Sequence, residues 1–255
     1  MPIDVTLRAE TRGALTIYPV ESARAFGVDA FVTDRFGGVS KDPYDSLNLA
    51  FHVGDDASDV EENRRRVAKA IDVALSKLTT VSQVHGCDVL DAASATSSSE
   101  ADALVYDVDD LALAVLVADC VPLLLVDASS PRFALVHAGW RGLQRGVIAR
   151  ALAHFEKASN VLAFIGPSIS MEGYQVGPEV ASHFEDVPGA LVSDDGDRSR
   201  LDLRCVATSQ LLDGGVADGH VVRSTQVTDG GEVFFSDRAR RPCGRFALVA
   251  RRALA

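Results

Sequence analysis

The sequence predicts a single α+β domain whose mixed β-sheets are flanked by helices. Its 255 residues, 47% of them hydrophobic, supply enough apolar side chains for one sizeable core. We find no internal repeat and no linker, so residues 1–255 are expected to form one domain. Predicted strands and helices mix without strict alternation, which favours mixed sheets over a doubly wound parallel sheet.

Seven apolar segments carry the expected strands. The central ones are nearly continuous apolar runs, which is typical of strands covered on both faces. Several follow one another closely enough to pair as hairpins. In chain order, the segments are residues 29–33, 79–84, 111–117, 123–127, 133–136, 161–165 and 246–250.

Four helices are expected. The first begins near Ser58, because Ser58 and Glu61 form a capping-box pattern before apolar residues at helical spacing. The others are expected to span about residues 142–157, 178–185 and 203–212.

Charge and cysteine content restrict the location and the partners. The formal net charge of −11 repels phosphate backbones, so nucleic acid is not an expected partner. No apolar run is long enough to cross a membrane, and the amino terminus does not resemble a secretory signal. The four cysteines have no CxxC spacing and are expected to be reduced thiols in the cytoplasm. The chain is compatible with a monomer.

A basic stretch lies near the carboxyl terminus. We expect its arginines to be mostly solvated or paired with local carboxylates. They are Arg238, Arg240, Arg241, Arg245, Arg251 and Arg252.

Three polar residues lie where apolar runs end: His85, Cys120 and His137. Loops at strand ends commonly carry functional groups. Two imidazoles and a thiolate form a suitable set of zinc ligands, and three protein ligands leave a fourth position free, as in catalytic zinc sites. Spacing alone does not decide between this site and ordinary core residues. Asp119, which precedes the cysteine, either takes part in catalysis or forms a turn.

Two further segments offer substrate contacts. The turn before the second expected helix contains Arg141, which is suited to an anion. A long stretch without a strand pattern contains Arg35, Ser40, Asn48 and His52. Long loops in compact domains tend to be functional, and Arg35 is suited to clamp a phosphate or carboxylate. A tight turn and an ordered surface loop are the alternatives.

Seven motifs occur along the chain in an order typical of one known family. They are SLNLAFHVGDD, NRRR, QVHG, ADCVPLLL, HAGWRG, IGPSI followed by YQVGPEV, and FFSDR. Together they resemble the YfiH-type laccase-domain family, whose members are also named polyphenol oxidases and are described as purine nucleoside phosphorylases. The resemblance extends from about Phe31 to Ala250.

The resemblance implies a single α+β domain classed with CNF/YfiH-like cysteine hydrolases. It implies a zinc ion held by His85, Cys120 and His137, with copper as the alternative metal. The implied activities are phosphorolysis of adenosine, inosine, guanosine and methylthioadenosine, and hydrolytic deamination of adenosine. The implied partners are therefore a purine nucleoside and phosphate, and the arginine of the RxGGVS loop, Arg35, is implied to contact phosphate or substrate.

The chain departs from the family pattern at three places. Gln175 stands where the family commonly has glutamate, and Ser224 where it commonly has cysteine. Asp237 replaces the tyrosine of FFSYRR. None of these is a ligand, but the lost carboxylate and the lost tyrosine bear on substrate preference.

Three other functions compete with a nucleoside phosphorylase. A copper oxidase of phenols agrees with the family name, but only six histidines are present, and none of them forms a CxxxH or HxH pattern. A Cys–His hydrolase, such as an amidase of cell-wall precursors, would use Cys120 as nucleophile and His137 or His85 as base. The remaining alternative is a nucleoside-binding module without catalysis.

Overall fold

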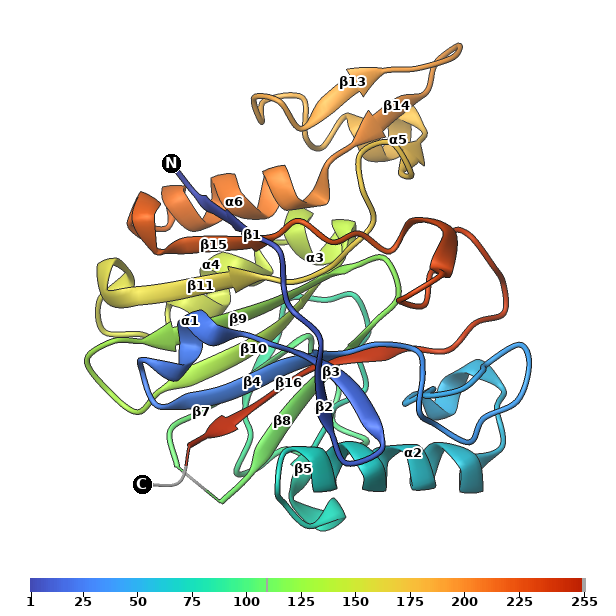
Figure 1. Ribbon diagram of the computed structural model, residues 1–255. Helices are drawn as coiled ribbons and strands as arrows, with labels where there is room; N and C mark the ends of the chain where they lie inside the picture. The colour runs from blue at the N-terminus through green and yellow to red at the C-terminus, as the bar shows by residue number, and fades with distance from the viewer. Residues whose placement is uncertain (109, 254–255) are drawn as a thin grey trace.

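The computed structural model describes residues 1–108 and 110–253, and it has four layers in the order helix, sheet, sheet, helix (Figure 1). Both large sheets contain parallel and antiparallel strand pairs, which confirms the predicted α+β class with mixed sheets. Within the described residues, no helix is long and apolar enough to cross a membrane.

One large sheet has seven strands. Its central pairs are antiparallel, while the strands at both edges add parallel pairs. The spatial order is β1 (Ile3–Val5), β15 (Val221–Ser224), β11 (Val161–Ile165), β9 (Val121–Asp127), β10 (Phe133–Ala138), β7 (Ala103–Tyr106) and β6 (Val89–Asp91).

The other large sheet has six strands. All of its pairs are antiparallel except the last, in which the short β5 runs parallel to β8. The spatial order is β2 (Glu10–Arg12), β3 (Leu15–Pro19), β4 (Val28–Thr33), β16 (Phe246–Arg252), β8 (Ala112–Val117) and β5 (Leu78–Thr79).

Both faces of the central strands are covered, which explains their continuous apolar sequences. Successive strand side chains point to opposite faces. In β8, Leu113 and Val115 enter the core between the sheets, whereas Ala114 and Leu116 face the outer core on the other side. No position in such a strand faces water, so alternation of polar and apolar residues is absent.

Helices cover the outer faces of both sheets (Figure 1). The six-stranded sheet packs against α2 (Ala57–Ala70). The seven-stranded sheet packs against α3 (Trp140–Gln144), α4 (Val147–Leu152) and α6 (Leu203–Asp213).

Smaller elements complete the chain. A three-stranded antiparallel sheet projects beyond α6 (Figure 1). It contains β12 (Gln175–Val176), β14 (Ser199–Leu201) and β13 (Leu191–Ser193), and α5 (Pro178–Ala181) lies beside it. The remaining elements are α1 (Glu21–Arg24) and five 3₁₀ turns, η1 (Phe51–Val53), η2 (Leu75–Lys77), η3 (Ala158–Asn160), η4 (Asp218–His220) and η5 (Asp229–Gly231).

Six of the seven expected strands are confirmed, and the segment 79–84 is not. Only Thr79 of that segment lies in β5. Beyond it, the Gln83 side chain donates to the Leu116 carbonyl at 2.7 Å and accepts from the Leu116 N–H at 2.8 Å. The side-chain amide of Gln83 therefore makes the hydrogen bonds to the backbone of β8 that the backbone of a longer neighbouring strand was expected to make.

The expected helix boundaries are partly wrong. Asp56, not Ser58, caps α2, because its carboxylate accepts from the Ser58 N–H. The expected helix 142–157 is divided into α3 and α4 by Gly146, whose φ of 78° is left-handed. The helix expected over 178–185 ends at Ala181. All four cysteines are free, as expected.

Candidate metal centre and substrate cavity

The fold brings His85, Cys120 and His137 together. One potential ligand atom from each residue lies within 4.8 Å of the others. His137 belongs to β10, opposite Pro122 at the start of β9, while Cys120 lies in the turn that carries the chain from the six-stranded sheet to the seven-stranded sheet. His85 follows β5, and its φ of 57° turns the chain toward the other two residues.

The three side chains are close enough to share one ion. The rings of His85 and His137 have centroids 4.8 Å apart and meet edge to face at 80°. The Cys120 sulfur lies 3.9 Å from Nε2 of His85. Gly139 makes this packing possible, because a Cβ there would stand 2.9 Å from the Cys120 sulfur and 3.0 Å from Cδ2 of His85.

A buried carboxylate holds two of the three residues in place. Asp102 is fully buried and pairs with Nδ1 of His137 at 2.8 Å. It also accepts from the backbone N–H groups of His85 at 3.0 Å and Gly86 at 2.6 Å. A carboxylate on the far nitrogen of a histidine fixes the tautomer and ring orientation, as in known carboxylate–histidine–zinc sites. Sequence reasoning missed Asp102.

The cluster favours a thiolate. Burial alone would raise the pKa of Cys120, but the charge of His137 and hydrogen bonds from both imidazoles hold that pKa well below its ordinary value. Burial would likewise lower the pKa of His137, whereas Cys120 and Asp102 raise it. The thiolate is the form of cysteine that binds metals and acts as a nucleophile.

The cluster opens into a cavity of about 440 Å³, within the range of about 300–1,000 Å³ typical of small-molecule sites. Most of the lining side chains are polar or charged. The lining residues are His52, Gln83, His85, Leu116, Val117, Ala118, Asp119, Cys120, His137, Trp140, Arg141, Tyr174, Asp237, Arg238, Arg241 and Arg245.

Asp119 lines the cavity, but both of its oxygens hold other segments in place. Oδ1 accepts from the Thr228 hydroxyl at 2.6 Å, and Oδ2 accepts from the Arg238 N–H at 2.7 Å. Its φ of 84° is unusual for a residue with a Cβ. Asp119 therefore forms the predicted turn and also lines the cavity, while its part in catalysis stays a prediction.

The predicted substrate contacts divide into two groups. His52 and Arg141 line the cavity, whereas Arg35, Ser40 and Asn48 are not among its lining residues. Burial, followed by the charges of neighbouring basic side chains, lowers the pKa of His52, which favours its neutral form.

The three residues outside the lining have structural partners. Arg35 donates to the carbonyls of Asp45 and Gly231, and its guanidinium lies 4.9 Å from the centre of the Phe235 ring. The Ser40 hydroxyl accepts from an Asn63 amide at 2.8 Å.

Asn48 acts on the cavity indirectly. Its Oδ1 accepts from the Arg245 N–H at 2.9 Å, so it holds the backbone of an arginine that lines the cavity. The same oxygen accepts from the Ala50 N–H at 3.0 Å, and the Asn48 side chain is fully buried.

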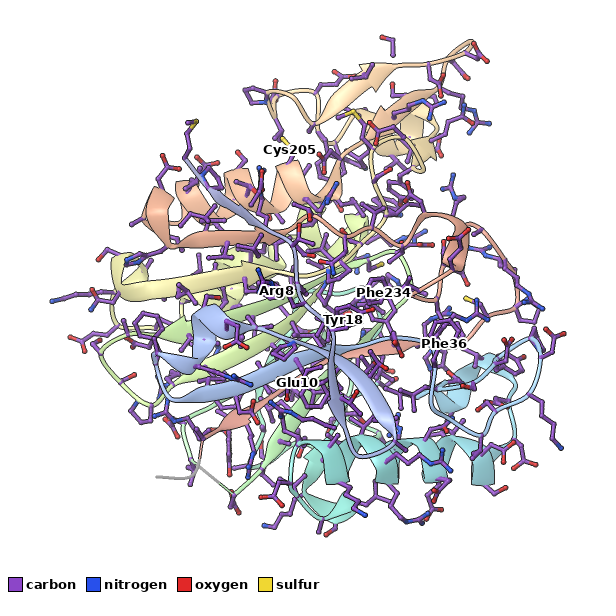
Figure 2. All side chains as sticks on the ribbon, in the orientation of Figure 1. Arg8, Glu10, Tyr18, Phe36, Cys205 and Phe234 are labelled. Carbon is purple, nitrogen blue, oxygen red and sulfur yellow. The ribbon has the colours of Figure 1, made fainter. Side chains whose placement is uncertain are left out.

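The basic stretch near the carboxyl terminus contributes more to the cavity than expected. Its loop begins at Phe234, which is buried and packs 5.5 Å from Tyr18 between ring centroids (Figure 2). From this anchor the chain carries Arg238, Arg241 and Arg245 to the cavity. Arg241 and Arg245 agree with the expectation of local pairing, because both form ion pairs with Asp237, whereas Arg240 pairs with the distant Asp42.

The three departures from the family pattern have different surroundings. The Gln175 side chain donates to Asp194 at 3.0 Å and is not among the cavity-lining residues. Ser224 is buried and donates to the Gln226 side chain at 2.8 Å. Asp237 alone of the three lines the cavity.

Residues 29–253 match the family model described as "Multi-copper polyphenol oxidoreductase laccase". The chain belongs to this family. The match confirms the resemblance drawn from the seven motifs.

Two curated relatives in the laccase-domain family are named purine nucleoside phosphorylases. The chain is 39% identical over 224 residues to one from Mycobacterium tuberculosis, which covers 85% of this chain and 89% of the relative. It is 38% identical over 226 residues to YfiH of Escherichia coli, which covers 87% of this chain and 92% of the relative.

Solved structures of laccase-domain relatives share the fold. YlmD from Geobacillus stearothermophilus superposes with a TM-score of 0.89 at 31% identity, covering 97% of this chain and 99% of that one. The Neisseria meningitidis protein NMB0706 gives a TM-score of 0.83 at 33% identity, covering 89% of this chain and 95% of that one.

Proposed function

We propose that the chain is a zinc-dependent purine nucleoside phosphorylase. The observation that carries the proposal is the convergence of two imidazoles and one thiolate within 4.8 Å at the base of a cavity of small-molecule size. The names of relatives that are 38–39% identical to this chain supply the reaction class.

The three residues fit a zinc ion by the chemistry of their donors. Zinc takes imidazole nitrogen and thiolate sulfur, and catalytic zinc sites keep three protein ligands and one open position. Gly139 leaves the space that the cluster occupies, and Asp102 orients His137. We therefore assign His85, Cys120 and His137, which all line the cavity, as the residues that would hold the ion.

A bound zinc would supply Lewis-acid stabilisation of negative charge on the substrate. The chain's own residues perform the remaining tasks. Asp102 holds the proton on Nδ1 of His137 and leaves the other ring nitrogen for the cluster. Asp119 fixes the loop that contains Arg238, and Trp140 and Tyr174 contribute aromatic surface for a purine or ribose.

The proposed substrates are phosphate with adenosine, inosine, guanosine or methylthioadenosine. We further propose that adenosine is deaminated in the same cavity, and that the protein acts in the cytoplasm, where its four free thiols stay reduced.

The test is release of ribose 1-phosphate from adenosine and inosine by the purified protein and by a Cys120→Ala variant. We expect the variant to lose both activity and zinc. Cys205→Ala is the matched control, because Cys205 lies on α6, outside the cavity lining (Figure 2). Equal turnover by the Cys120→Ala variant and the wild type would overturn the zinc mechanism.

A copper oxidase of phenols is a second candidate, favoured by the name of the family to which the chain belongs. Multicopper chemistry needs several copper sites, whereas the described residues contain one group of three histidine, cysteine or acidic ligands within bonding range of a shared ion. Copper-dependent oxygen consumption with a phenol, without nucleoside turnover, would favour this candidate.

A Cys–His hydrolase is a third candidate, favoured by the lowered pKa of Cys120 beside His137. Protein purified without chelators and found free of metal, together with selective alkylation of Cys120, would favour it.

A further inference from the structure

The charge of the cavity is opposite to that of the chain. The whole chain has a formal net charge of −11, but four arginines and only two aspartates line the cavity. Four cationic side chains around one concave site attract an anion even on an acidic protein, because low-dielectric walls focus the local field.

The two aspartates do not neutralise the four arginines equally. Asp119 uses its oxygens on the Thr228 hydroxyl and the Arg238 backbone N–H. Asp237 forms ion pairs with Arg241 and, at 3.1 Å, with Arg245.

Two of the lining arginines are left without a carboxylate. Across residues 1–108 and 110–253, no ion pair involves Arg141 or Arg238. Both residues are exposed, and both line the cavity.

Aromatic rings hold these two guanidiniums. That of Arg141 lies 4.4 Å from the centre of the Trp140 ring, and that of Arg238 lies 5.0 Å from the centre of the Tyr174 ring. Arg238 also donates from Nη1 to the Gln175 carbonyl at 2.8 Å. Stacking restrains the plane of a guanidinium and leaves N–H groups along its edge for an acceptor.

The two arginines line the same cavity as Tyr174 and Cys120. Burial raises the pKa of Tyr174 to about 12, and the charges of Cys120 and Asp119 add to the rise, whereas those of Arg238 and Arg141 oppose it. Both guanidiniums and the Cys120 thiolate therefore act on the electrostatics of one side chain of the cavity wall.

We propose that Arg141 and Arg238 form the phosphate subsite of the cavity and bind inorganic phosphate bidentately beside the metal centre. This assignment rests on the proposed function, in which phosphate is the second substrate. A phosphate oxygen forms a bond to the anomeric carbon of the nucleoside as the glycosidic C–N bond breaks. The purine leaves with the electron pair of that bond and takes up the proton that the phosphate gives up, and ribose 1-phosphate is the other product.

The experiment compares Arg141→Gln and Arg238→Gln with the wild type. Dissociation constants for inorganic phosphate are measured by isothermal titration calorimetry, and KM values for phosphate and inosine are measured separately. Loss of a charge-assisted bidentate contact is expected to raise the dissociation constant and the KM for phosphate by about 10- to 100-fold. The KM for inosine is expected to change less than the KM for phosphate, because the aromatic rings proposed to contact the nucleoside are retained in both variants.

Arg240→Gln is the matched control. Arg240 lies on the same loop as Arg238, but it pairs with Asp42 and is not among the cavity-lining residues. Its phosphate KM is expected to equal that of the wild type. Arg238→Lys is a second variant, expected to recover part of the affinity because it keeps the charge and loses the planar fork. Zinc content and unfolding temperature establish that each variant is folded.

The outcomes separate the subsite from the proposed function. If the wild type releases ribose 1-phosphate and both glutamine variants keep its phosphate KM, the subsite assignment is overturned and the phosphorylase stands. If the wild type binds phosphate without phosphorolysis and both variants lose that binding, the subsite stands and the phosphorylase is overturned.

Discussion

Replacing Asp102 with asparagine tests whether this buried carboxylate assembles the metal centre. With the amide oxygen toward His137 and His85, the new NH₂ group meets the Gly86 N–H, whose nitrogen lies 2.6 Å from the present oxygen. With the amide reversed, the NH₂ group faces Nδ1 of His137 and moves the imidazole proton to the nitrogen needed for the metal. Each orientation therefore leaves buried donors opposed.

The expected loss is set by those hydrogen bonds. A hydrogen bond to a charged group contributes about 1.5–3 kcal/mol, and an unsatisfied buried donor costs about 1–3 kcal/mol. We expect Asp102→Asn to lower the free energy of unfolding by about 3 kcal/mol, which for a chain of this size lowers the unfolding temperature by about 6–12 °C. Zinc affinity is expected to fall about 10- to 100-fold.

Thermal unfolding and competitive zinc titration measure the two effects. Asp88→Asn is the control, because Asp88 forms an ion pair with Arg150 at 3.2 Å in which both side chains are more than half exposed. Such surface pairs contribute little to stability. Wild-type unfolding temperature and wild-type zinc affinity in Asp102→Asn would refute the role given to this carboxylate.

Asp119, Gly139 and Asp102 each give a further testable expectation for the metal centre and its cavity. Asp119→Asn is expected to keep turnover, because its amide can accept from the Arg238 N–H and donate to a reoriented Thr228 hydroxyl. Asp119→Ala, which can do neither, is expected to raise the KM for phosphate. A large fall in kcat for Asp119→Asn would instead show that the negative charge of Asp119 takes part in the chemical step. Gly139→Ala places a methyl group 2.9 Å from the Cys120 sulfur. The substitution is expected to lower the free energy of unfolding by about 1–3 kcal/mol and to reduce the zinc content. Full zinc stoichiometry in the purified variant would contradict the close packing. Burial alone would raise the pKa of Asp102, but the hydrogen bond and charge of His137 hold that pKa below its ordinary value. The stability that ionised Asp102 gives the folded state is therefore complete above about pH 4, and it is lost as the pH falls through the folded-state pKa. Urea unfolding of wild type and Asp102→Asn across this range should show their difference narrowing on the acid side, and a difference independent of pH would count against this linkage.

The central strands could be predicted from sequence because burial on both faces makes them continuously apolar. The edge strands could not, since short strands with exposed faces have no such pattern. β1 has the sequence Ile-Asp-Val and β2 the sequence Glu-Thr-Arg, and both edge strands are mostly exposed. The division of the second helix depends on the left-handed backbone of Gly146, and a glycine within a helical pattern does not by itself reveal its φ.

The site residues show a similar limit. The two histidines and the cysteine could be proposed because each follows an apolar run and matches a family motif. Asp102 has neither feature, and its partner His137 is 35 positions further along the chain. Arg238 lies in a basic stretch, where solvation is the ordinary expectation. The hydrogen bond from its N–H to Asp119, 119 positions away, which helps to hold it at the cavity, has no local sequence signal.

The position of the site follows from a crossing between the two large sheets. β8 and β9 are consecutive in sequence but belong to different sheets, so the turn at 118–120 must leave one sheet and enter the other. That turn includes the left-handed Asp119, whose conformation is held by Thr228 and the Arg238 N–H. A strained backbone conformation of this kind persists only where the surrounding contacts hold it in place. The packing of the two sheets therefore determines where Cys120 lies. The three proposed metal ligands are spread over 53 positions of sequence, so their meeting depends on the global fold rather than on any local motif.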